Sequence, residues 1–487
     1  MDRKIFEKKI SDLNITAKPL LGLIFKYNKS IYFYDSVSAE IIRINSFMKE
    51  LIEALMKKSQ KSRLERIYLF ALNQSFNKVI GGLKYINIKR KEDNILNPYP
   101  ENLEIVLKDQ YHPKKPNLIN LVLEVTQNCN LRCKYCIYGE NYTYERKRTK
   151  VFMSKNVAFK AIKYFLNNPG HPEPSITFFG GEPLLKKSFI EASVKYAKHI
   201  NPNTKFFITT NGILLKPEFF DFIRTHQISV GISIDGPKDI HDSYRVLSGG
   251  EGTFDIIKRN IEMLYKIDAE YLKSKFKLLI TLTDIKNLKI ISNFLRKNPI
   301  LNDLTVTINK IRLEGINENI SEFNNQLPEN NLLESIINTY VKNNINKKFK
   351  SITAESAYLS PMLSLVYKRK PLKRKSYFSK ICTIGDWRLF VDVKGNLRIC
   401  EKTDRLPIIG NIDYGIDWEI LEKMRQDFLS SCKPCRNCWA VKMCNVCWTD
   451  IYNKYGKIDQ NIKSNVCKKK LIEYEIGLKT FVALTGK

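Results

Sequence analysis

Short apolar runs alternate with helical patterns six times between residues 119 and 310, and this regularity restricts the possible folds. Strand–helix–strand units keep one hand, so they build a parallel sheet that curls and is covered by helices. The loops that follow the strands then gather on one rim, where such folds place their chemistry. The sequence therefore predicts an α/β fold over this region. The expected strands are 120–126, 175–179, 205–209, 228–234, 277–283 and 304–308, and the expected helices are 154–167, 186–199, 216–226, 254–266 and 286–297.

The loops after the first four strands carry distinctive residues. Cys129–Cys136 has the pattern CxxxCxxC, and Gly180–Pro183, Thr209–Gly212 and Ser233–Gly236 follow the next three strands. Three thiolates within eight residues are one ligand short of the four that an iron–sulfur cluster or a structural zinc usually takes. An incomplete set leaves one metal position open, as catalytic metal sites do. Four such loops on one rim predict an active site.

Eleven cysteines occur in the chain, and they fall into two groups. No apolar run approaches the ~18 residues of a membrane span, and residues 1–10 lack a signal-peptide pattern. We therefore expect a cytoplasmic protein without a membrane span, whose reduced thiols bind metal. Spacing alone also allows zinc ribbons in the second group. Three cysteines are Cys129, Cys133 and Cys136, and the other eight are Cys382, Cys400, Cys432, Cys435, Cys438, Cys444, Cys447 and Cys467.

The formal net charge is +31, which raises the possibility of a nucleic-acid partner. Lysine is spread along the whole length, and the basic stretch Lys368–Lys375 lacks interleaved aromatic residues. Solvated lysine-rich faces are the expected explanation, so no nucleic-acid partner is predicted. A zinc-ribbon nucleic-acid-binding protein stays open as the alternative from another class.

A front module is predicted over residues 1–95, followed by a linker over 96–118 that is rich in Pro, Asn and Lys. The module contains no cysteine and no histidine, so it is not expected to carry chemistry. Its pattern of strands followed by helices indicates an α+β, winged-helix-like unit. The expected strands are 20–25, 31–34, 41–44 and 85–88, and the expected helices are 47–55 and 62–76.

The CxxxCxxC loop, with Tyr135 just before its third cysteine, resembles the signature of the radical S-adenosylmethionine (SAM) enzymes. The resemblance covers residues 119–310 and implies a partial (β/α)6 barrel. In that family the three cysteines hold a four-iron cluster whose open iron binds the amino and carboxylate groups of SAM. Reduction of the bound sulfonium gives methionine and a 5′-deoxyadenosyl radical. The resemblance thus implies a radical SAM oxidoreductase.

The same resemblance implies a set of SAM contacts. Gly180–Pro183 is similar to the family's GGEP loop, where glycines permit close backbone approach and Glu182 supplies negative charge. The guanidinium of Arg245 could bind the SAM carboxylate with two hydrogen bonds. Asp235 and His241 could instead cap a turn. The implied cofactor-binding residues are Tyr135, Gly180, Gly181, Glu182, Pro183, Asn211, Ser233, Asp235 and Arg245.

The second cysteine group, over residues 381–487, looks like the SPASM extension that holds two auxiliary four-iron clusters, which makes three 4Fe–4S clusters in all. Only two residues separate Cys444 from Cys447, where the usual pattern has three. Cys432 is an additional cysteine that could complete the first auxiliary cluster; otherwise that cluster keeps an open iron for a substrate thiolate. By resemblance, the first auxiliary cluster takes Cys382, Cys400 and Cys447, and the second takes Cys435, Cys438, Cys444 and Cys467.

A bridging region, 311–380, joins barrel and extension, and Glu401 falls where sulfatase-maturing members carry a catalytic aspartate. The front module resembles the peptide-recognition element of enzymes that modify ribosomal peptides, where a leader adds as an extra strand. A shielding or dimerising role stays open. The resemblance implies a peptide maturase that forms a thioether or carbon–carbon cross-link in a leader-bearing precursor. Its external electron donor would be of flavodoxin or ferredoxin type. A formylglycine-forming sulfatase maturase is the second enzyme candidate.

Overall fold

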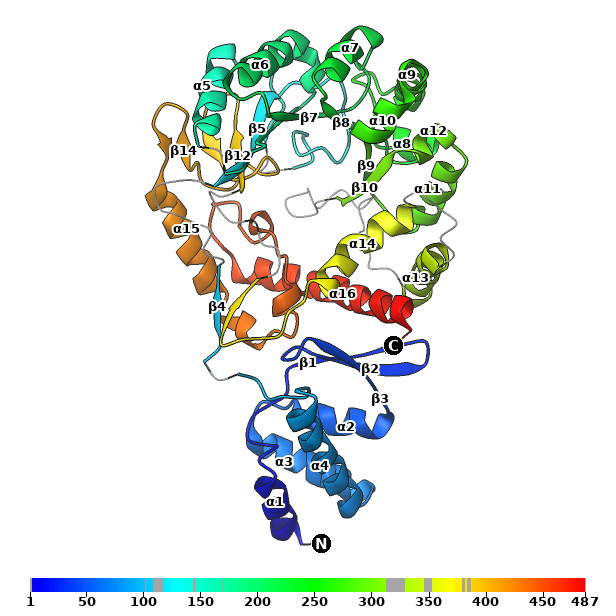
Figure 1. Ribbon diagram of the computed structural model, residues 1–487, viewed down its shortest axis with the longest axis vertical. Coiled ribbons are helices and arrows are strands. Elements are labelled where there is room, and N and C mark those ends of the chain that lie inside the picture. The colour runs from blue at the N-terminus through cyan, green and yellow to red at the C-terminus, as the bar shows by residue number, and fades with distance from the viewer. Residues whose placement is uncertain are drawn as a thin grey trace.

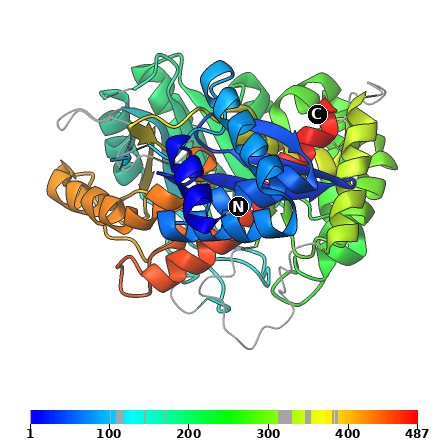
Figure 2. The ribbon, with the colours of Figure 1, turned by 90° about the horizontal axis from the view of Figure 1, so that it is seen from below.

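The computed structural model describes residues 2–100, 102–107, 117–142, 146–168, 170–311, 329–345, 353–378, 382 and 387–486. An arc of strands covered by helices forms one end of the molecule, and the N-terminal helices form the other (Figure 1). The cysteine-rich C-terminal part lies between them. Seen from below, the blue N-terminal module stands in front of the rest of the chain (Figure 2).

The arc is an eight-stranded sheet with the order β10-β9-β8-β7-β6-β5-β12-β13. Neighbours from β5 to β10 pair in parallel, which confirms the predicted partial barrel. Each observed strand lies within two residues of its predicted bounds. The six strands are β5 (Leu118–Thr126), β6 (Ser175–Gly180), β7 (Lys205–Thr210), β8 (Ser229–Ser233), β9 (Phe276–Leu282) and β10 (Thr305–Lys310).

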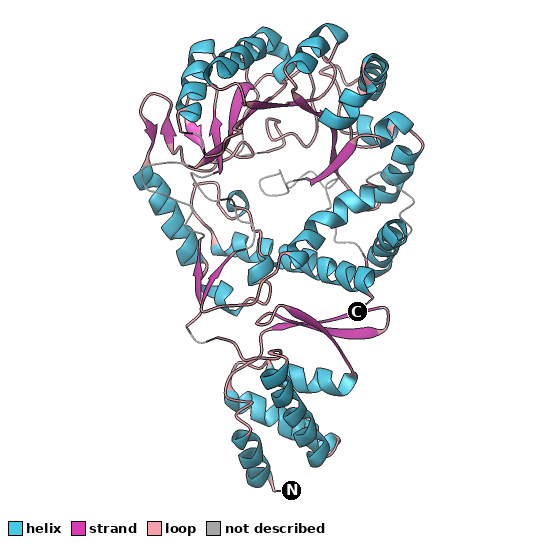
Figure 3. Ribbon diagram, in the orientation of Figure 1, coloured by secondary structure: helices cyan, strands magenta, loops and turns pink. Residues whose placement is uncertain are grey.

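Helices cover the outer face of this sheet, while the strands line the inside of the arc (Figure 3). The predicted helices are present because each turns an apolar stripe towards the sheet; Ser154 also caps the first helix by accepting from Val157 N. Three short helices were not predicted. The barrel helices are α5 (Lys155–Leu166), α6 (Lys187–Ile200), α7 (Pro217–Thr225), α8 (Lys238–Asp242), α9 (Phe254–Ile267), α10 (Ala269–Lys275), α11 (Asn287–Arg296) and α12 (Pro299–Asn302).

The C-terminal part extends the barrel sheet. Strand β12 (Trp387–Val391) pairs in parallel with β5, and β13 (Leu397–Arg398) pairs antiparallel with β12. This continuation was not predicted, because the pairing joins strands more than 260 residues apart. The remaining elements are β14 (Gly410–Asn411), β15 (Gly415–Ile416), α15 (Trp418–Ser431), three 3-10 turns at Lys433–Asn437, Val441–Met443 and Trp448–Asp450, and α16 (Gln460–Thr485).

The bridging region contributes α13 (Asn330–Ile345), α14 (Ala354–Tyr367) and β11 (Lys375–Tyr377). Helix α14 packs against α16, α11 and β10, so it joins the open end of the barrel sheet to the C-terminal helix. Strand β11 pairs in parallel with β4 (Glu104–Val106), which lies inside the predicted linker. The segment between the front module and the barrel is therefore partly anchored.

The front module contains one antiparallel sheet, with the order β1-β2-β3, and four helices. The predicted strand at 85–88 is wrong. Those residues lie in α4, because Val79, Leu83 and Ile86 recur at helical spacing and are fully buried. The elements are α1 (Arg3–Asp12), β1 (Gly22–Tyr27), β2 (Ser30–Asp35), β3 (Glu40–Ile44), α2 (Ser46–Leu55), α3 (Gln60–Asn73) and α4 (Phe76–Glu92).

Both faces of the front sheet are packed. Alternate residues of a strand point to opposite faces, and Phe33 lies in the core formed with the module's own helices. Its neighbours Tyr32 and Tyr34 belong to the core shared with the rest of the chain. The ring of Tyr34 meets Trp439 edge-on with centroids 6.1 Å apart, and Ser36 Oγ donates to Trp439 O at 2.6 Å. The sheet is therefore fixed against the cysteine-rich part.

Candidate functional site

The loop that carries Cys129, Cys133 and Cys136 follows β5. Hydrogen bonds within the loop and to a neighbouring segment hold it in place. Within the loop, Leu131 N donates to Cys129 Sγ at 3.4 Å and Cys136 N to Cys133 O at 3.2 Å. Outside it, the loop pairs with 244–247. The three thiols interact electrostatically with one another, and burial raises the pKa of Cys129 to about 11 and of Cys133 to about 12. They therefore form one group.

The glycines of the GGEP loop are required by the chain's own backbone. Gly180 has φ +140°, and a Cβ there would lie 2.2 Å from Thr126 O. A Cβ on Gly181 would lie 2.1 Å from Asn128 O, while the real Gly181 N donates to Thr126 O at 2.8 Å. No side chain fits at either position. The second strand-end loop thus rests directly against the base of the cysteine loop.

Glu182 is fully buried and links the second and third strand-end loops. Its Oε1 accepts from Leu184 N at 2.9 Å and from Thr210 Oγ1 at 2.8 Å, and its Oε2 accepts from Asn211 N at 2.8 Å. Burial raises the pKa of Glu182 to about 6, although these hydrogen bonds oppose the shift. Pro183 follows as the first residue of a buried 3-10 turn. Glu182 therefore fixes the loop that presents Asn211.

Asn211 reaches back to the first loop. Its Nδ2 donates to Asn130 Oδ1 at 2.8 Å and lies 3.9 Å from Cys129 Sγ. Ser233, the last residue of β8, is also buried and lies two positions before Asp235. Three of the four predicted loops are thus joined by side-chain hydrogen bonds next to a cysteine.

Asp235 and Arg245 form a buried ion pair with Nε–Oδ2 of 3.0 Å. Asp235 also accepts from Thr281 N at 2.8 Å and from the hydroxyl of Tyr135. Arg245 Nη1 lies 3.9 Å from Cys133 Sγ, and its guanidinium lies 5.4 Å from the centre of the Tyr135 ring. The structure therefore brings Tyr135, Asp235 and Arg245 together beside the cysteines.

His241 has a supporting position. Its Nδ1 accepts from Asp235 N at 3.3 Å, and its Nε2 lies 3.0 Å from Thr253 Oγ1. Burial, assisted by Arg245, lowers the pKa of His241 to about 4. A neutral imidazole that accepts at one nitrogen and donates at the other fits these contacts. The turn-capping alternative is thus the better description of His241.

The C-terminal thiols fall into two groups by their electrostatic interactions, which we call the first and second auxiliary groups. Arg388 interacts electrostatically with both Cys382 and Cys400, and Cys400 interacts with Cys447. In the second group, Cys438 interacts with Cys435 and Cys467, and Cys444 interacts with Cys438 and Cys435. Cysteines distant in sequence, such as Cys400 and Cys447 or Cys435 and Cys467, therefore interact within one group.

Cys432 was left with two possible roles by the sequence, as a further ligand of the first auxiliary cluster or as a residue outside it. Its thiol hydrogen-bonds to Cys435 of the second auxiliary group and lies 3.5 Å from Lys463 Nζ. Cys432 ends α15, and the following 3-10 turn places residues three apart on one side. The hydrogen bond with Cys432 lowers the pKa of Cys435 to about 6. Cys432 therefore belongs to the second group.

Glu401 is buried and paired with Arg388 at 2.7 Å between Nη1 and Oε1. Burial acts to raise the pKa of Glu401, but the positive charges of Arg388 and Lys402 outweigh it and hold the pKa below its usual value. The carboxylate is thus ionised and lies within the first auxiliary group, next to Cys400.

The donor sets suit iron–sulfur clusters. Among the described residues, no three Cys, His, Asp or Glu side chains converge closely enough to hold a single metal ion. Thiols that bind different irons of one cluster stand farther apart than ligands of one ion, and thiolates are the ligands such clusters take. The two groups of three suit clusters on this ground, and the group of five contains one thiol more than the four that such a cluster usually takes.

Sequence reasoning missed a buried network that joins two of these groups. Glu124, on β5, accepts from Tyr138 OH at 2.7 Å and pairs with Arg146 at 3.0 Å. Arg146 Nη2 then donates to Cys400 O at 3.4 Å and Thr403 O at 3.3 Å. The signal was available, because Glu124 is a lone charge within a buried apolar strand and such a charge needs a partner.

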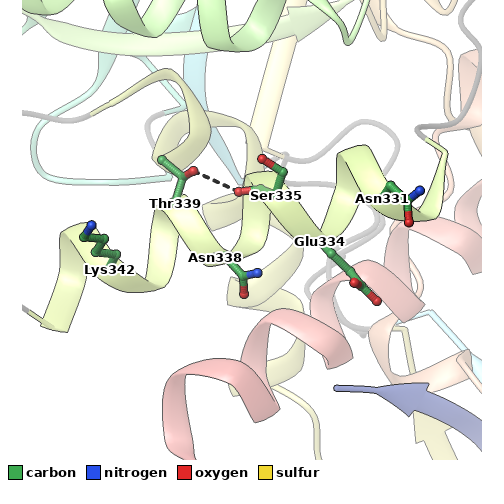
Figure 4. Close-up of a pocket in the computed structure, with 6 residues that line it drawn as sticks. All are labelled: Asn331, Glu334, Ser335, Asn338, Thr339 and Lys342. Atoms are coloured by element: carbon green, nitrogen blue, oxygen red, sulfur yellow. Dashed lines mark hydrogen bonds between the residues drawn. The ribbon is translucent and has the colours of Figure 1, made fainter. Parts of the chain in front are cut away.

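A separate open pocket of about 450 Å³ lies on α13, far in sequence from every residue predicted to bind SAM or metal (Figure 4). Asn338, on its wall, accepts from Tyr27 OH of the front module at 3.0 Å. The pocket is lined by Asn331, Glu334, Ser335, Asn338, Thr339 and Lys342.

Comparison with known proteins assigns the class of the barrel. Residues 123–288 match the radical SAM superfamily. This range holds the first cysteine group and the residues gathered around it. The chain thus contains a radical SAM domain.

Particular relatives match about a third of the chain. A serine-type anaerobic sulfatase-maturating enzyme of Bacteroides thetaiotaomicron is 34% identical over 166 residues, 33% of this chain and 40% of that protein. A cysteine-type enzyme of Clostridium novyi is 32% identical over 160 residues, 32% and 42% of the two chains. The matched segment thus spans about two fifths of these relatives.

The likeness in structure is broader. The structure of anSMEcpe with bound AdoMet covers 76% of this chain and 100% of that one, with a TM-score of 0.57 and 21% identity. A further structure of anSMEcpe, with AdoMet and the Cp18Cys peptide, has a TM-score of 0.54 and 22% identity. Both establish a shared fold, and about a quarter of this chain lies outside it. No helix among the described residues is both long and apolar enough to cross a membrane.

Proposed function

We propose that this protein is a radical SAM enzyme that modifies a ribosomally made precursor peptide by forming a thioether or carbon–carbon cross-link. The observation that carries the proposal is the contact of the front sheet with the loop of the second cysteine group, through Tyr34, Ser36 and Trp439. A module that contains a β-sheet is thus fixed next to the cysteines that would hold the second auxiliary cluster. This arrangement supports a peptide as the substrate.

At the barrel, Cys129, Cys133 and Cys136 would hold the first 4Fe–4S cluster. When bound there, the cluster supplies the electron that splits SAM into methionine and a 5′-deoxyadenosyl radical. Arg245, oriented by Asp235, would pair with the SAM carboxylate. Asn211 and the backbone of the Gly180–Pro183 loop would border the same ligand. Electrons would come from an external flavodoxin or ferredoxin.

The peptide would be held at two places. Strand β3 pairs with β2 alone among the described strands, so its outer edge can accept an extended leader by strand addition. Glu401, held ionised by Arg388 at 2.7 Å, would accept a proton from the modified residue beside Cys400. Three thiols in the first auxiliary group leave a position for a substrate thiolate.

Formylglycine formation in a sulfatase is the second candidate. The 34% and 32% identity to two sulfatase-maturating enzymes favours it. The matched segment covers only about two fifths of them, so their substrates do not transfer directly. The front module lies outside residues 123–288, the part with a family match. We rank peptide cross-linking first for that reason.

The SAM reaction is tested with anaerobically reconstituted enzyme, SAM and dithionite, by chromatography of 5′-deoxyadenosine. We expect product from the full chain and none from a variant with Cys129, Cys133 and Cys136 all replaced by alanine. Deoxyadenosine from that variant at the wild-type rate would refute the assignment of the cluster.

The substrate is tested with two peptides: a leader-bearing precursor rich in cysteine, and a sulfatase-type peptide with one reactive cysteine. Mass spectrometry should show the loss of two hydrogens from the precursor, without reaction with an aldehyde-specific hydrazide. A hydrazide-reactive product from the sulfatase-type peptide would instead favour formylglycine formation. Turnover of SAM with both peptides unchanged would contradict both candidates.

A further inference from the structure

Lys463 is a buried lysine within the second auxiliary group. It lies in the first turn of α16 and is 6% exposed. Its Nζ donates to Ser431 O at 2.6 Å, to Ser431 Oγ at 2.8 Å and to Cys432 Sγ at 3.5 Å. An ammonium group has three N–H donors, and these three acceptors match them. Lys463 is therefore placed as a fully hydrogen-bonded cation.

The groups that face this cation are the thiols of the second auxiliary group. None of the ion pairs among the described residues includes Lys463, although a charge this deeply buried needs compensation. Lys463 interacts electrostatically with Cys435 and with Cys467, two of the expected ligands. Its hydrogen bond to Cys432 adds a third cysteine contact. The compensating negative charge must come from this thiol group and from whatever the group binds.

The first auxiliary group has a different balance of charge. Its cations include Arg388 and Lys402. Arg388 is paired with Glu401 at 2.7 Å between Nη1 and Oε1, with half of its side chain exposed, and Lys402 is exposed to solvent. The carboxylate offsets that positive charge, and solvent screens it further. Among the described residues, no carboxylate pairs with the buried Lys463, and solvent does not screen its charge. The two groups therefore differ in how strongly they attract an added electron.

We propose that Lys463 is a positioning residue that raises the reduction potential of the iron–sulfur cluster held by Cys435, Cys438, Cys444 and Cys467. The proposal rests on the proposed function, which places a cluster there. Uptake of one electron adds one negative charge to the cluster, with no bond broken and no proton transferred. A fixed cation nearby favours the more negative state. The second auxiliary cluster is thereby the preferred electron acceptor of the two.

The test is a potentiometric titration of the full-length reconstituted enzyme, poised with dithionite and redox mediators and followed by electron paramagnetic resonance. The variant Cys435→Ala identifies the signal of the second cluster by its loss. Lys463→Met should make one-electron reduction of that cluster at least ten times less favourable, a downward shift of about 59 mV for a one-electron couple. The signals of the other clusters should stay at their wild-type potentials.

Two variants serve as matched controls. Lys463→Arg keeps the buried charge and should keep most of the wild-type potential. Lys468→Met removes the same charge from an exposed position on the same helix, and should have a much smaller effect because water screens it. If the Lys463→Met protein does not retain iron at the second auxiliary group, the titration is done with Lys463→Gln, in which the side chain is neutral but polar.

Two results would overturn the inference: a potential for Lys463→Met or Lys463→Gln equal to that of the wild type, or equal shifts for Lys463→Arg and the neutral variants. Failure of the proposed function gives a different result. In that case Cys435→Ala would contain as much iron as the wild type, and no signal would be lost.

Discussion

Arg146 and Glu124 form a buried ion pair, 3.0 Å between Nη1 and Oε1, that joins the barrel to the C-terminal part. Glu124 Oε2 accepts from Val393 N at 3.0 Å, and Arg146 stacks over Phe390 with its guanidinium 4.1 Å from the ring centre. Through Cys400 O, the same arginine reaches the first auxiliary group. One ion pair therefore helps to set the position of an auxiliary cysteine relative to the barrel.

Replacing Arg146 should destabilise the protein strongly. Arg146→Met leaves Glu124 buried without its partner, and we expect a loss of about 3 to 5 kcal/mol in the free energy of unfolding, measured by urea denaturation. The double variant Glu124→Gln/Arg146→Met should recover part of the loss. As a control, Lys160→Met breaks an exposed pair with Asp413 and should cost about 1 kcal/mol or less. Equal losses for Arg146→Met and Lys160→Met would contradict this account.

Asp235 should govern SAM binding through Arg245. Asp235→Asn removes the negative charge that orients the guanidinium, so we expect the Kd for SAM to rise about tenfold, equivalent to about 1.4 kcal/mol. Isothermal titration of the reconstituted enzyme measures this. Asp239→Asn makes the same chemical change at an exposed site on α8 and should leave the Kd unchanged. An unaltered Kd in Asp235→Asn would remove Arg245 from the binding site.

His241 should make stability depend on pH. The pKa of His241 is about 4 in the folded protein and 6.5 ordinarily, so as pH falls below 6.5 the unfolded chain takes up a proton that the folded chain does not. The contribution of His241 to the free energy of unfolding is therefore largest above pH 6.5. It decreases by about 3 kcal/mol as the pH falls to about 4.

The measurement is the difference in unfolding free energy between the wild type and His241→Gln, across pH 4 to 7.5. Glutamine does not titrate, and the contribution of Glu182 cancels in the difference. The stability advantage of the wild type should shrink as pH falls below 6.5. A difference that is constant with pH would show that His241 protonates equally well in both states.

Tyr34 should tolerate the loss of its hydroxyl. The side chain is fully buried, and its OH has no hydrogen-bond partner among the described residues. Tyr34→Phe should therefore preserve stability or raise it by about 1 kcal/mol. Tyr271 offers a matched contrast, because its OH lies 2.7 Å from Ile228 O. Tyr271→Phe should cost about 1 to 3 kcal/mol in thermal or urea unfolding; the opposite ranking of the two variants would be inconsistent with these contacts.

The local pattern of apolar and polar residues was enough to predict much of the fold. The six parallel strands and their main helices were predicted from periodicity, because a buried strand and a half-buried helix each leave a repeat in the sequence. The same reasoning failed at 85–88, where β-branched residues and an aromatic suggested a strand. Packing of Val79, Leu83 and Ile86 in the module's core outweighed that preference.

Part of the candidate site was also predictable. Cys129, Gly180, Asn211 and Asp235 follow successive strands, so a parallel sheet must bring them to one edge. The glycines have an additional structural role that the sequence did not predict, since Gly181 is required by contact with Asn128 O. A close approach between backbone segments distant in sequence leaves no local pattern.

The sequence by itself determined which chemistry the chain can carry: thiols in groups of fixed spacing and a barrel whose strand-end loops must converge. Tertiary structure alone decided that Cys432 hydrogen-bonds to Cys435, that Lys463 lies beside Cys432 and that Arg146 contacts both Glu124 and Cys400. The physical reason is that burial and long-range contacts set the electrostatic surroundings of a charged group. Those surroundings depend on partners that no local stretch of sequence specifies.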